Sequence, residues 1–396
     1  MKSQCQRAIF RNGWSSLINE RPKEVQEDMS VLQVKRVIHK YVAMAQWKTN
    51  LSKATRLSPA DALLKLSEFY FQAIPKFFRE NTVQSNVDLQ IIVPVYNVEK
   101  YLEDCIQSML SQRTSFSYQV VFVDDGSTDH SGEILDKYKE NLFVKIIHTK
   151  NGGVSKARNI ALRSITGKYI MFVDSDDVLA PNSIQTLMET AFLHNAEIVE
   201  GSYQDFDDNG MKGIHCHIGK TCAYDSFNYF GFPWGKVIRS DCLKHFCFPE
   251  GFLFEDTVMS TLLYPECHNT YTVPDVVYYY RNNPTGITST CTANPRCIDT
   301  FWIMKYCLEE RVRRGQSLQE RDLERYLFAI YRNWGRTRGM PYDIQESIFL
   351  LTCQLIETAF GAIIQEYSGK YMKIFKTVKF RSFDAFLALA SNGYIE

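Results

Sequence analysis

Four short apolar runs, each ending in a cluster of polar or turn-forming residues, constrain the fold of this chain more than any other feature. The runs cover residues 89–93, 119–123, 144–148 and 169–173. Amphipathic segments follow them and predict helices at 101–112, 131–141, 154–165 and 183–195. Strands that alternate with such helices predict an α/β fold, with a mostly parallel sheet flanked by helices on both faces. Ligands of open sheets bind beyond the carboxyl ends of the strands, so the polar clusters predict one shared site.

The 396 residues exceed the comfortable size of one hydrophobic core, so several structural units are expected. We predict an N-terminal helical region at 1–86, the α/β domain at 87–290 and a C-terminal helical region at 291–396. The polar residues 81–86 are expected to form a linker. We expect no secretory leader, and no stretch that approaches the roughly 20 apolar residues of a membrane span.

The charge balance and the cysteine content indicate which class of partner and which cellular compartment to expect. The chain has 45 Lys and Arg residues against 45 Asp and Glu residues, and a chain without basic excess is a poor candidate for a nucleic-acid binder. Its 11 cysteines are scattered and odd in number, as expected of reduced thiols in the cytoplasm.

Two aspartates end the fourth apolar run. Asp174 and Asp176 are one residue apart, and side chains at i and i+2 of an extended chain share one side. Such hard oxygen ligands suit Mg²⁺ or Mn²⁺ that bridges phosphate oxygens, with water and substrate completing the coordination. The alternative is a solvated turn that caps the helix around Pro181. An EF-hand is excluded, because the sixth and twelfth positions from Asp174 are Leu179 and Gln185.

A second acidic pair, Asp124 and Asp125, ends the second run. Adjacent carboxylates repel each other unless a positive or hydrogen-bonding group lies between or beside them. A nucleobase whose ring N–H donates to one carboxylate would relieve this repulsion. Tyr96, just past the first run, would stack on that base. The alternatives are an ordinary turn whose Asp129 caps the next helix, and an ordinary aromatic side chain at the rim.

Two further clusters carry chemistry. Lys156 and Arg158 follow a Gly-Gly pair at the start of a helix, where they and the helix N-terminus would meet a diphosphate. Glu255 and Asp256 follow an aromatic stretch, and burial there would raise the pKa of Asp256 from about 3.9 toward that of a useful base. The alternative for this pair is a helix N-terminus with favourable acids, and taken alone it is the stronger.

Together these segments resemble the family-two inverting glycosyltransferases of the GT-A fold. The resemblance covers roughly residues 88–288 and is carried by 93–102, 123–129, 151–159, 172–177, 234–237, 255–256 and 278–281. It implies a metal-dependent enzyme, using Mn²⁺ or Mg²⁺, that moves a hexosyl or N-acetylhexosaminyl group from a UDP-sugar to a hydroxyl of a glycan acceptor. The acceptor would be a cell-surface polysaccharide or a lipid-linked or protein-linked glycan.

The resemblance also implies roles for individual residues. The uracil pocket would consist of Pro94, Tyr96, Glu99 and Asp125; the nucleotide would meet Arg158; the metal pair would be Asp174 and Asp176; the base would be Asp256. Asn283 stands where a histidine sometimes follows the Tyr-Arg pair, so the resemblance names no further metal ligand.

Two alternatives stay open. A catalytically silent nucleotide-sugar-binding or scaffold module would have the same fold, although an intact set of Asp174, Asp176 and Asp256 argues against it. The second concerns residues 370–383, where lysines interleave with apolar residues. This segment is either a basic amphipathic helix on the inner membrane face or an ordinary helix whose apolar side is packed.

Overall fold

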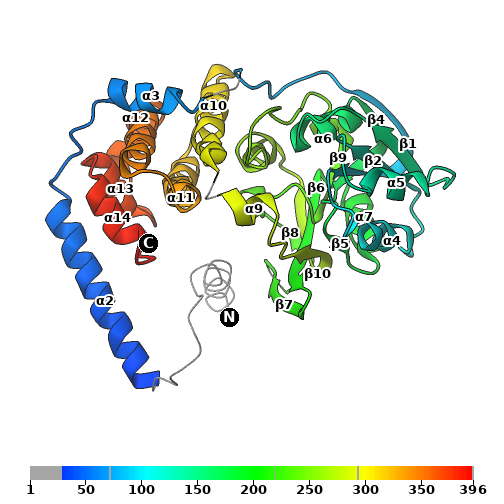
Figure 1. Ribbon diagram of the computed structural model, residues 1–396, viewed down its shortest axis with the longest axis horizontal. Coiled ribbons are helices and arrows are strands. Elements are labelled where there is room, and N and C mark those ends of the chain that lie inside the picture. The colour runs from blue at the N-terminus through cyan, green and yellow to red at the C-terminus, as the bar shows by residue number, and fades with distance from the viewer. Residues whose placement is uncertain (1–28, 71–72, 218, 292–293, 395–396) are drawn as a thin grey trace. The chain divides into compact units, whose positions relative to one another are not determined.

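The computed structural model describes residues 29–70, 73–217, 219–291 and 294–394; residues 1–28 of the expected N-terminal region lie outside it. The described chain divides into two compact units (Figure 1). Residues 74–284 form an α/β unit, and residues 29–70 join 285–394 in a helical unit. The two helical regions that we expected as separate ends of the chain therefore fold together.

The α/β unit is built on one sheet, whose described strands number ten. Their order is β3-β2-β1-β4-β9-β6-β10-β5, with β7 paired to β6 and β8 to β10. The bounds are β1 Thr82–Val95, β2 Tyr118–Asp124, β3 Val144–His148, β4 Ser164–Phe172, β5 Val178–Leu179, β6 Ile198–Asp207, β7 Gly210–His215, β8 Cys222–Ala223, β9 Lys236–Arg239 and β10 Thr270–Arg281.

The long strand pairings of the sheet are parallel, as predicted, whereas the shorter β5, β7 and β8 pair antiparallel with β10 or β6. β3, β2, β1 and β4 are parallel neighbours, and β6 is parallel to β10. The exception at its centre is β9, which runs antiparallel to both β4 and β6. The long apolar runs are explained by burial on both faces, since a central parallel strand has no solvent-facing side.

Helices cover both faces of this sheet. The bounds in the α/β unit are α4 Leu102–Leu110, α5 Ser131–Asp136, α6 Val154–Leu162, α7 Ser183–His194 and α8 Ser240–Leu243, with short turns η1 Ser226–Asn228, η2 Met259–Leu263 and η3 Tyr264–Glu266. Leu89, Ile91 and Val93 of β1 share one core cluster with residues of α4 and α7. α6 lies against β1, β2 and β4 but contributes nothing to that cluster, so it covers the other face.

The expected linker at 81–86 is wrong, because β1 already begins at Thr82. Thr82 pairs with Ser164 of β4, which itself begins earlier than the apolar run at 169–173. Asn81 is buried, and its amide donates 2.8 Å hydrogen bonds to the carbonyl oxygens of Leu243 and Phe246. Asn81 therefore belongs to the folded unit, because backbone carbonyl groups accept from its amide nitrogen.

The helical unit consists of α2 and α3 together with the C-terminal helices. The bounds are α2 Met29–Asn50, α3 Pro59–Ser67, α9 Ile287–Thr290, η5 Pro295–Ile298, α10 Asp299–Arg313, α11 Glu320–Thr337, α12 Tyr342–Glu366, α13 Met372–Lys379 and α14 Phe383–Ala390. Ser58 caps α3 by accepting from the Asp61 amide at 3.1 Å, with Pro59 in the first turn. α3 packs on α12, and Trp47 of α2 packs on Leu389 of α14.

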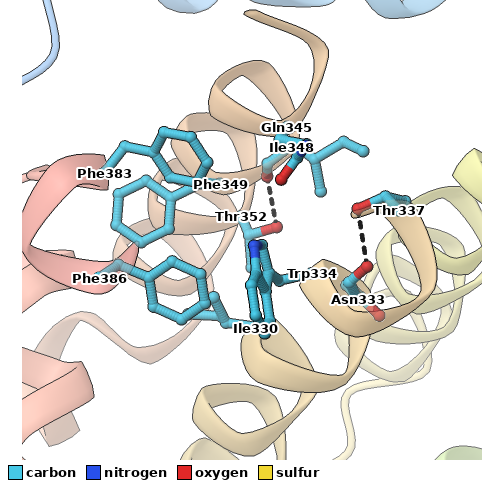
Figure 2. A pocket seen from close by; sticks show the side chains of 10 residues that line it. All are labelled: Ile330, Asn333, Trp334, Thr337, Gln345, Ile348, Phe349, Thr352, Phe383 and Phe386. Atoms are coloured by element: carbon cyan, nitrogen blue, oxygen red, sulfur yellow. Dashed lines mark hydrogen bonds between the residues drawn. The ribbon is translucent and has the colours of Figure 1, made fainter. Parts of the chain in front are cut away.

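α12 is the one described helix that is long and apolar enough to cross a membrane, with a mean hydropathy of 1.8, which our sequence expectation missed. Half of the apolar window is buried inside the unit. Figure 2 shows its environment: Phe349 of α12 lies with Phe383 and Phe386 of α14 around a small hollow beside Trp334. The apolar side of α12 thus has protein partners.

The basic segment 370–383 is not one helix. α13 ends at Lys379, Arg381 has a positive φ of 47°, and α14 begins at Phe383. Ile374, Phe375 and Val378 are buried in the helical unit. The structure favours the packed alternative for this segment, and any contact with an anionic membrane would rest on its exposed lysines and on Phe380.

Candidate functional site

The carboxyl ends of β2, β1 and β4 lie side by side. In the parallel register Val95 faces Asp124, and Ile92 faces Phe172. The predicted convergence of the polar clusters is therefore confirmed for the three strands. Asp125 and Asp174 follow directly at this edge of the sheet.

Asp125 is held by the backbone that begins α6. Its carboxylate accepts from the Gly152 amide at 2.9 and 3.1 Å and from the Gly153 amide at 2.6 Å. Gly153 has a φ of 88°, a conformation that an L side chain rarely adopts. Asp125 is buried, so these amide donors replace the water that a carboxylate would otherwise bind.

Asp124 has a different partner, which sequence analysis did not identify. Its Oδ2 lies 2.8 Å from Nδ1 of His148, and its Oδ1 accepts from the Ser127 amide at 3.0 Å. The hydrogen bond to Asp124 raises the pKa of His148, and Asp136 adds to the effect. Donors within the chain thus offset the repulsion between Asp124 and Asp125. The signal was available, because His148 ends the neighbouring run and faces Asp124 in the register.

The end of β1 and the loop after it carry three of the predicted uracil-pocket residues. Pro94 is buried in β1, whereas the Tyr96 side chain is 49% exposed. Glu99 accepts from the His130 amide at 2.8 Å, and its own amide donates to Asp129 at 3.0 Å. Glu99 therefore ties the loop after β1 to the start of α5.

Arg158 lies between two carboxylates. Its Nη2 donates to Oδ1 of Asp174 at 2.7 Å and its Nη1 donates to Oε1 of Glu255 at 2.6 Å. The Arg158 side chain is only 3% exposed. Burial opposes its charge, but Asp174 and Glu255 outweigh that effect and raise the pKa of the guanidinium. Arg158 thus connects the end of β4 to the distant acidic pair.

The acidic cluster after β4 contains one residue whose role the sequence did not reveal. Asp177 is buried; it accepts from the Tyr278 hydroxyl at 2.8 Å and from the Arg281 amide at 2.7 Å. The same hydroxyl accepts from the Asp174 amide at 3.0 Å. Burial and the negative charges of Asp176 and Asp174 raise the pKa of Asp177 well above its ordinary value. Asp177 anchors the cluster to β10.

Asp174 and Asp176 have the chemistry of a site for a hard divalent cation. Burial, with the negative charge of Asp174, raises the pKa of Asp176, although a hydrogen bond from Asn283 opposes this. Two neighbouring carboxylates that repel each other gain from a shared cation. Among the described residues there is no group of three or more His, Cys, Asp or Glu side chains able to hold a metal. Such a pair therefore fits an ion that takes most ligands from water and substrate, as Mg²⁺ does.

Asp256 begins the helical segment that leads into η2. Its Oδ1 is buried and, within the described part of the chain, has no hydrogen-bond partner. The preceding Phe254 has a φ of 62°, which is unusual for a bulky side chain. The pair thus begins a helix, as in the alternative interpretation, yet Glu255 also holds Arg158, and Asp256 carries an unpaired oxygen. Burial raises the pKa of Glu255.

Comparisons with known proteins agree with this architecture. Residues 90–251 match the family model of Glycosyl transferase family 2. Glycosyltransferase GlyG of Streptococcus pneumoniae is 29% identical over 221 residues, 51% of this chain and 73% of GlyG. Glycosyltransferase YibD of Escherichia coli is 36% identical over 219 residues, 51% of this chain and 63% of YibD. The match to GlyA of S. pneumoniae, at 32% identity, covers only 30% of that protein.

Solved structures extend the likeness beyond the matched domain. The crystal structure of Staphylococcus aureus TarS 1–349 in complex with UDP-GlcNAc superimposes with a TM-score of 0.63 at 21% sequence identity. The superposition covers 78% of this chain and 91% of that one, and at such identity it shows a shared fold. The sequence match, the sheet and the TarS fold together make residues 90–251 a glycosyl transferase family 2 domain of the GT-A fold, and the chain that carries it is a glycosyltransferase.

Proposed function

We propose that this chain is an inverting, metal-dependent glycosyltransferase that moves a sugar from a UDP-sugar to a hydroxyl of a glycan acceptor in the cytoplasm. The observation that carries the proposal is the set of contacts around α6. Asp125 binds the backbone at its start, and Arg158 on the same helix binds both Asp174 and Glu255, the neighbour of Asp256. Groups from distant segments therefore meet at one edge of the sheet.

The donor nucleotide is assigned to the loops after β1 and β2. Tyr96 is exposed enough to stack on uracil, with Pro94 and Glu99 shaping the pocket. A carboxylate has about four acceptor sites, and the three contacts from the Gly152 and Gly153 amides leave one on Asp125 for the base N–H. TarS 1–349, which shares the fold, was solved with UDP-GlcNAc and with UDP, and this supports a UDP-sugar donor.

Asp174 and Asp176 would hold the cation. When bound, Mn²⁺ or Mg²⁺ supplies positive charge against the diphosphate that leaves with the nucleotide. The buried Arg158 holds Asp174 in place and adds a fixed positive charge nearby. These residues thus stabilise the negative charge of the leaving group.

Asp256 is the proposed base. It takes the proton of the acceptor hydroxyl while that oxygen attacks the anomeric carbon from the face opposite the UDP. The new glycosidic bond forms as the bond from carbon to the UDP oxygen breaks, so configuration inverts in one displacement. The buried Oδ1 of Asp256, without a hydrogen-bond partner in the described chain, supports this role because it can accept from an incoming hydroxyl.

The acceptor class is proposed from a relative of this chain. A relative of 30% identity over 209 residues is the poly(ribitol-phosphate) β-N-acetylglucosaminyltransferase TarS, of which the match covers 36%. That relative transfers N-acetylglucosamine to poly(ribitol-phosphate), which supports an N-acetylhexosaminyl donor and a polymeric acceptor for this chain. A panel of nucleotide sugars, scored for UDP release with and without Mn²⁺, tests the donor and the metal together.

The base is tested by Asp256→Asn, with Asp275→Asn at an exposed position of β10 as the control. We expect turnover of Asp256→Asn to fall by roughly a hundredfold or more while UDP-sugar binding persists. Near-normal turnover would assign the base to another residue. Binding of UDP-sugars by the unaltered chain without turnover of any donor and acceptor would favour the catalytically silent module instead.

A further inference from the structure

Asp176 is held from the far side by the end of β10. The Asn283 Nδ2 donates to Oδ2 of Asp176 at 2.9 Å, and the Arg281 Nε donates to the Asp176 carbonyl oxygen at 2.7 Å. One contact fixes the side chain and the other fixes the backbone. Both come from the end of β10 and the residues just after it, more than a hundred residues away in the sequence.

The segment that carries these donors is itself firmly placed. The Arg281 amide donates to Asp177, and its guanidinium lies 4.5 Å from the ring centroid of Tyr101 and 4.4 Å from that of Phe206. The Asn283 amide donates to the Arg281 carbonyl oxygen at 2.8 Å. The amide group of Asn283 therefore meets Asp176 from a fixed backbone and not from a free loop.

We propose that Asn283 is a positioning residue for the cation: its hydrogen bond to Oδ2 of Asp176 fixes the orientation of the carboxylate that would hold the metal. The proposal rests on the cation site of the proposed function. The last torsion of an aspartate is broad, so a carboxylate without such a bond samples many orientations. A hydrogen bond to one oxygen removes that freedom before the metal arrives, as outer-shell groups do in metal sites generally.

The neighbouring Asn282 provides a matched control. It is an exposed asparagine of the same segment, and its backbone amide donates to the Phe206 carbonyl oxygen at 2.8 Å. An Asn→Ala change at 282 keeps that backbone bond and leaves Asp176 untouched. A difference between the two alanine variants therefore reports the side-chain contact of Asn283.

The test measures Mn²⁺ binding to the full-length chain by the electron paramagnetic resonance signal of free Mn²⁺. We expect Asn283→Ala to weaken Mn²⁺ binding roughly 10- to 100-fold, Asn282→Ala to bind like the unaltered chain, and Asp176→Asn to lose the site. Melting curves without metal should coincide for the two alanine variants. In UDP-release assays, excess Mn²⁺ should restore the turnover of Asn283→Ala.

Two results would overturn the proposal while leaving the cation site intact. The first is Mn²⁺ binding by Asn283→Ala equal to that of Asn282→Ala, provided that Asp176→Asn abolishes binding. The second is a loss of metal-free stability in Asn283→Ala that excess Mn²⁺ does not offset, which would make the residue structural. If Asp176→Asn binds Mn²⁺ like the unaltered chain, the cation site itself is refuted, and the role of Asn283 with it.

Discussion

Replacing Arg158 by methionine should destabilise the α/β unit strongly. The Arg158 side chain is 3% exposed, and its partners Glu255 and Asp174 are 13% and 30% exposed. Methionine fills much of the same space but leaves both carboxylates without their cation. Glu255, the more deeply buried partner, then carries a charge that neither water nor protein balances.

Two independent figures agree on the size of the effect. Each hydrogen bond to a charged group contributes about 1.5–3 kcal/mol, and Arg158 makes two of them. Breaking a buried ion pair by removing one partner costs about 3–5 kcal/mol. Because Asp174 regains water more easily than Glu255, we expect a loss of about 3–4 kcal/mol in the free energy of opening.

Hydrogen exchange followed by mass spectrometry is the appropriate assay. The chain has two compact units, so a single melting temperature would mix their stabilities. Peptides from β1 and β4 report the opening free energy of the α/β unit alone. Arg113→Met, at an exposed position, serves as the control and should change that free energy by less than about 0.5 kcal/mol.

The stability losses caused by substitutions at Arg158 and Glu255 should not add. Glu255→Gln removes the stranded charge, so the double variant with Arg158→Met should be more stable than the sum of the single losses predicts, by about 1–3 kcal/mol. Strict additivity, or a loss in Arg158→Met no larger than in Arg113→Met, would show that the two ion pairs contribute nothing to the unit.

Two other predictions concern pH and packing. The hydrogen bond to Asp124 raises the pKa of His148, so its stabilising effect is complete below the usual value of about 6.5 and disappears as the pH rises through the raised value. The stability difference between the unaltered chain and His148→Gln should therefore shrink on going from acidic to alkaline buffer; a constant difference in urea titrations would contradict this. Gly167→Ala should destabilise the unit by about 1–3 kcal/mol, because the added Cβ would lie 2.4 Å from the Gln90 backbone nitrogen. Gly213→Ala, whose Cβ would meet only a histidine ring nitrogen at 4.0 Å, should be near neutral when both variants are compared by hydrogen exchange of the β1 and β4 peptides.

The sequence predicted best where one physical effect dominated. The central strands were visible because burial on both faces demands continuous apolar runs, and the order of those runs predicted their parallel pairing. The polar start of β1 was missed, because composition does not reveal that carbonyl groups will satisfy Asn81. Nor could it reveal that the helices before residue 74 pack with those after 285, since amphipathic patterns specify a face but not its partner.

In the candidate site too, the sequence predicted what local patterns encode and missed contacts between distant segments. Asp125, Asp174 and Asp176 were found because strand ends place them at one edge of the sheet. Arg158 was identified, but its two carboxylate partners were not, because Glu255 lies 97 residues away. The contact of Asp177 with Tyr278 and that of Asn283 with Asp176 were not predicted for the same reason: they join the segments that follow β4 to β10 and the residues after it, and no local pattern encodes them. The roles in catalysis remain predictions for the experiments above.

The reversed strand β9 has a consequence for how the α/β unit can be divided. It is the only described strand hydrogen-bonded to β4 on that side, and it joins β4 to β6. A polypeptide that stops before residue 236 would leave the β4 backbone donors and acceptors open to a second molecule. The strands before and after β9 thus form one cooperative unit, and a recombinant fragment that ends between them should self-associate instead of folding as a small independent protein.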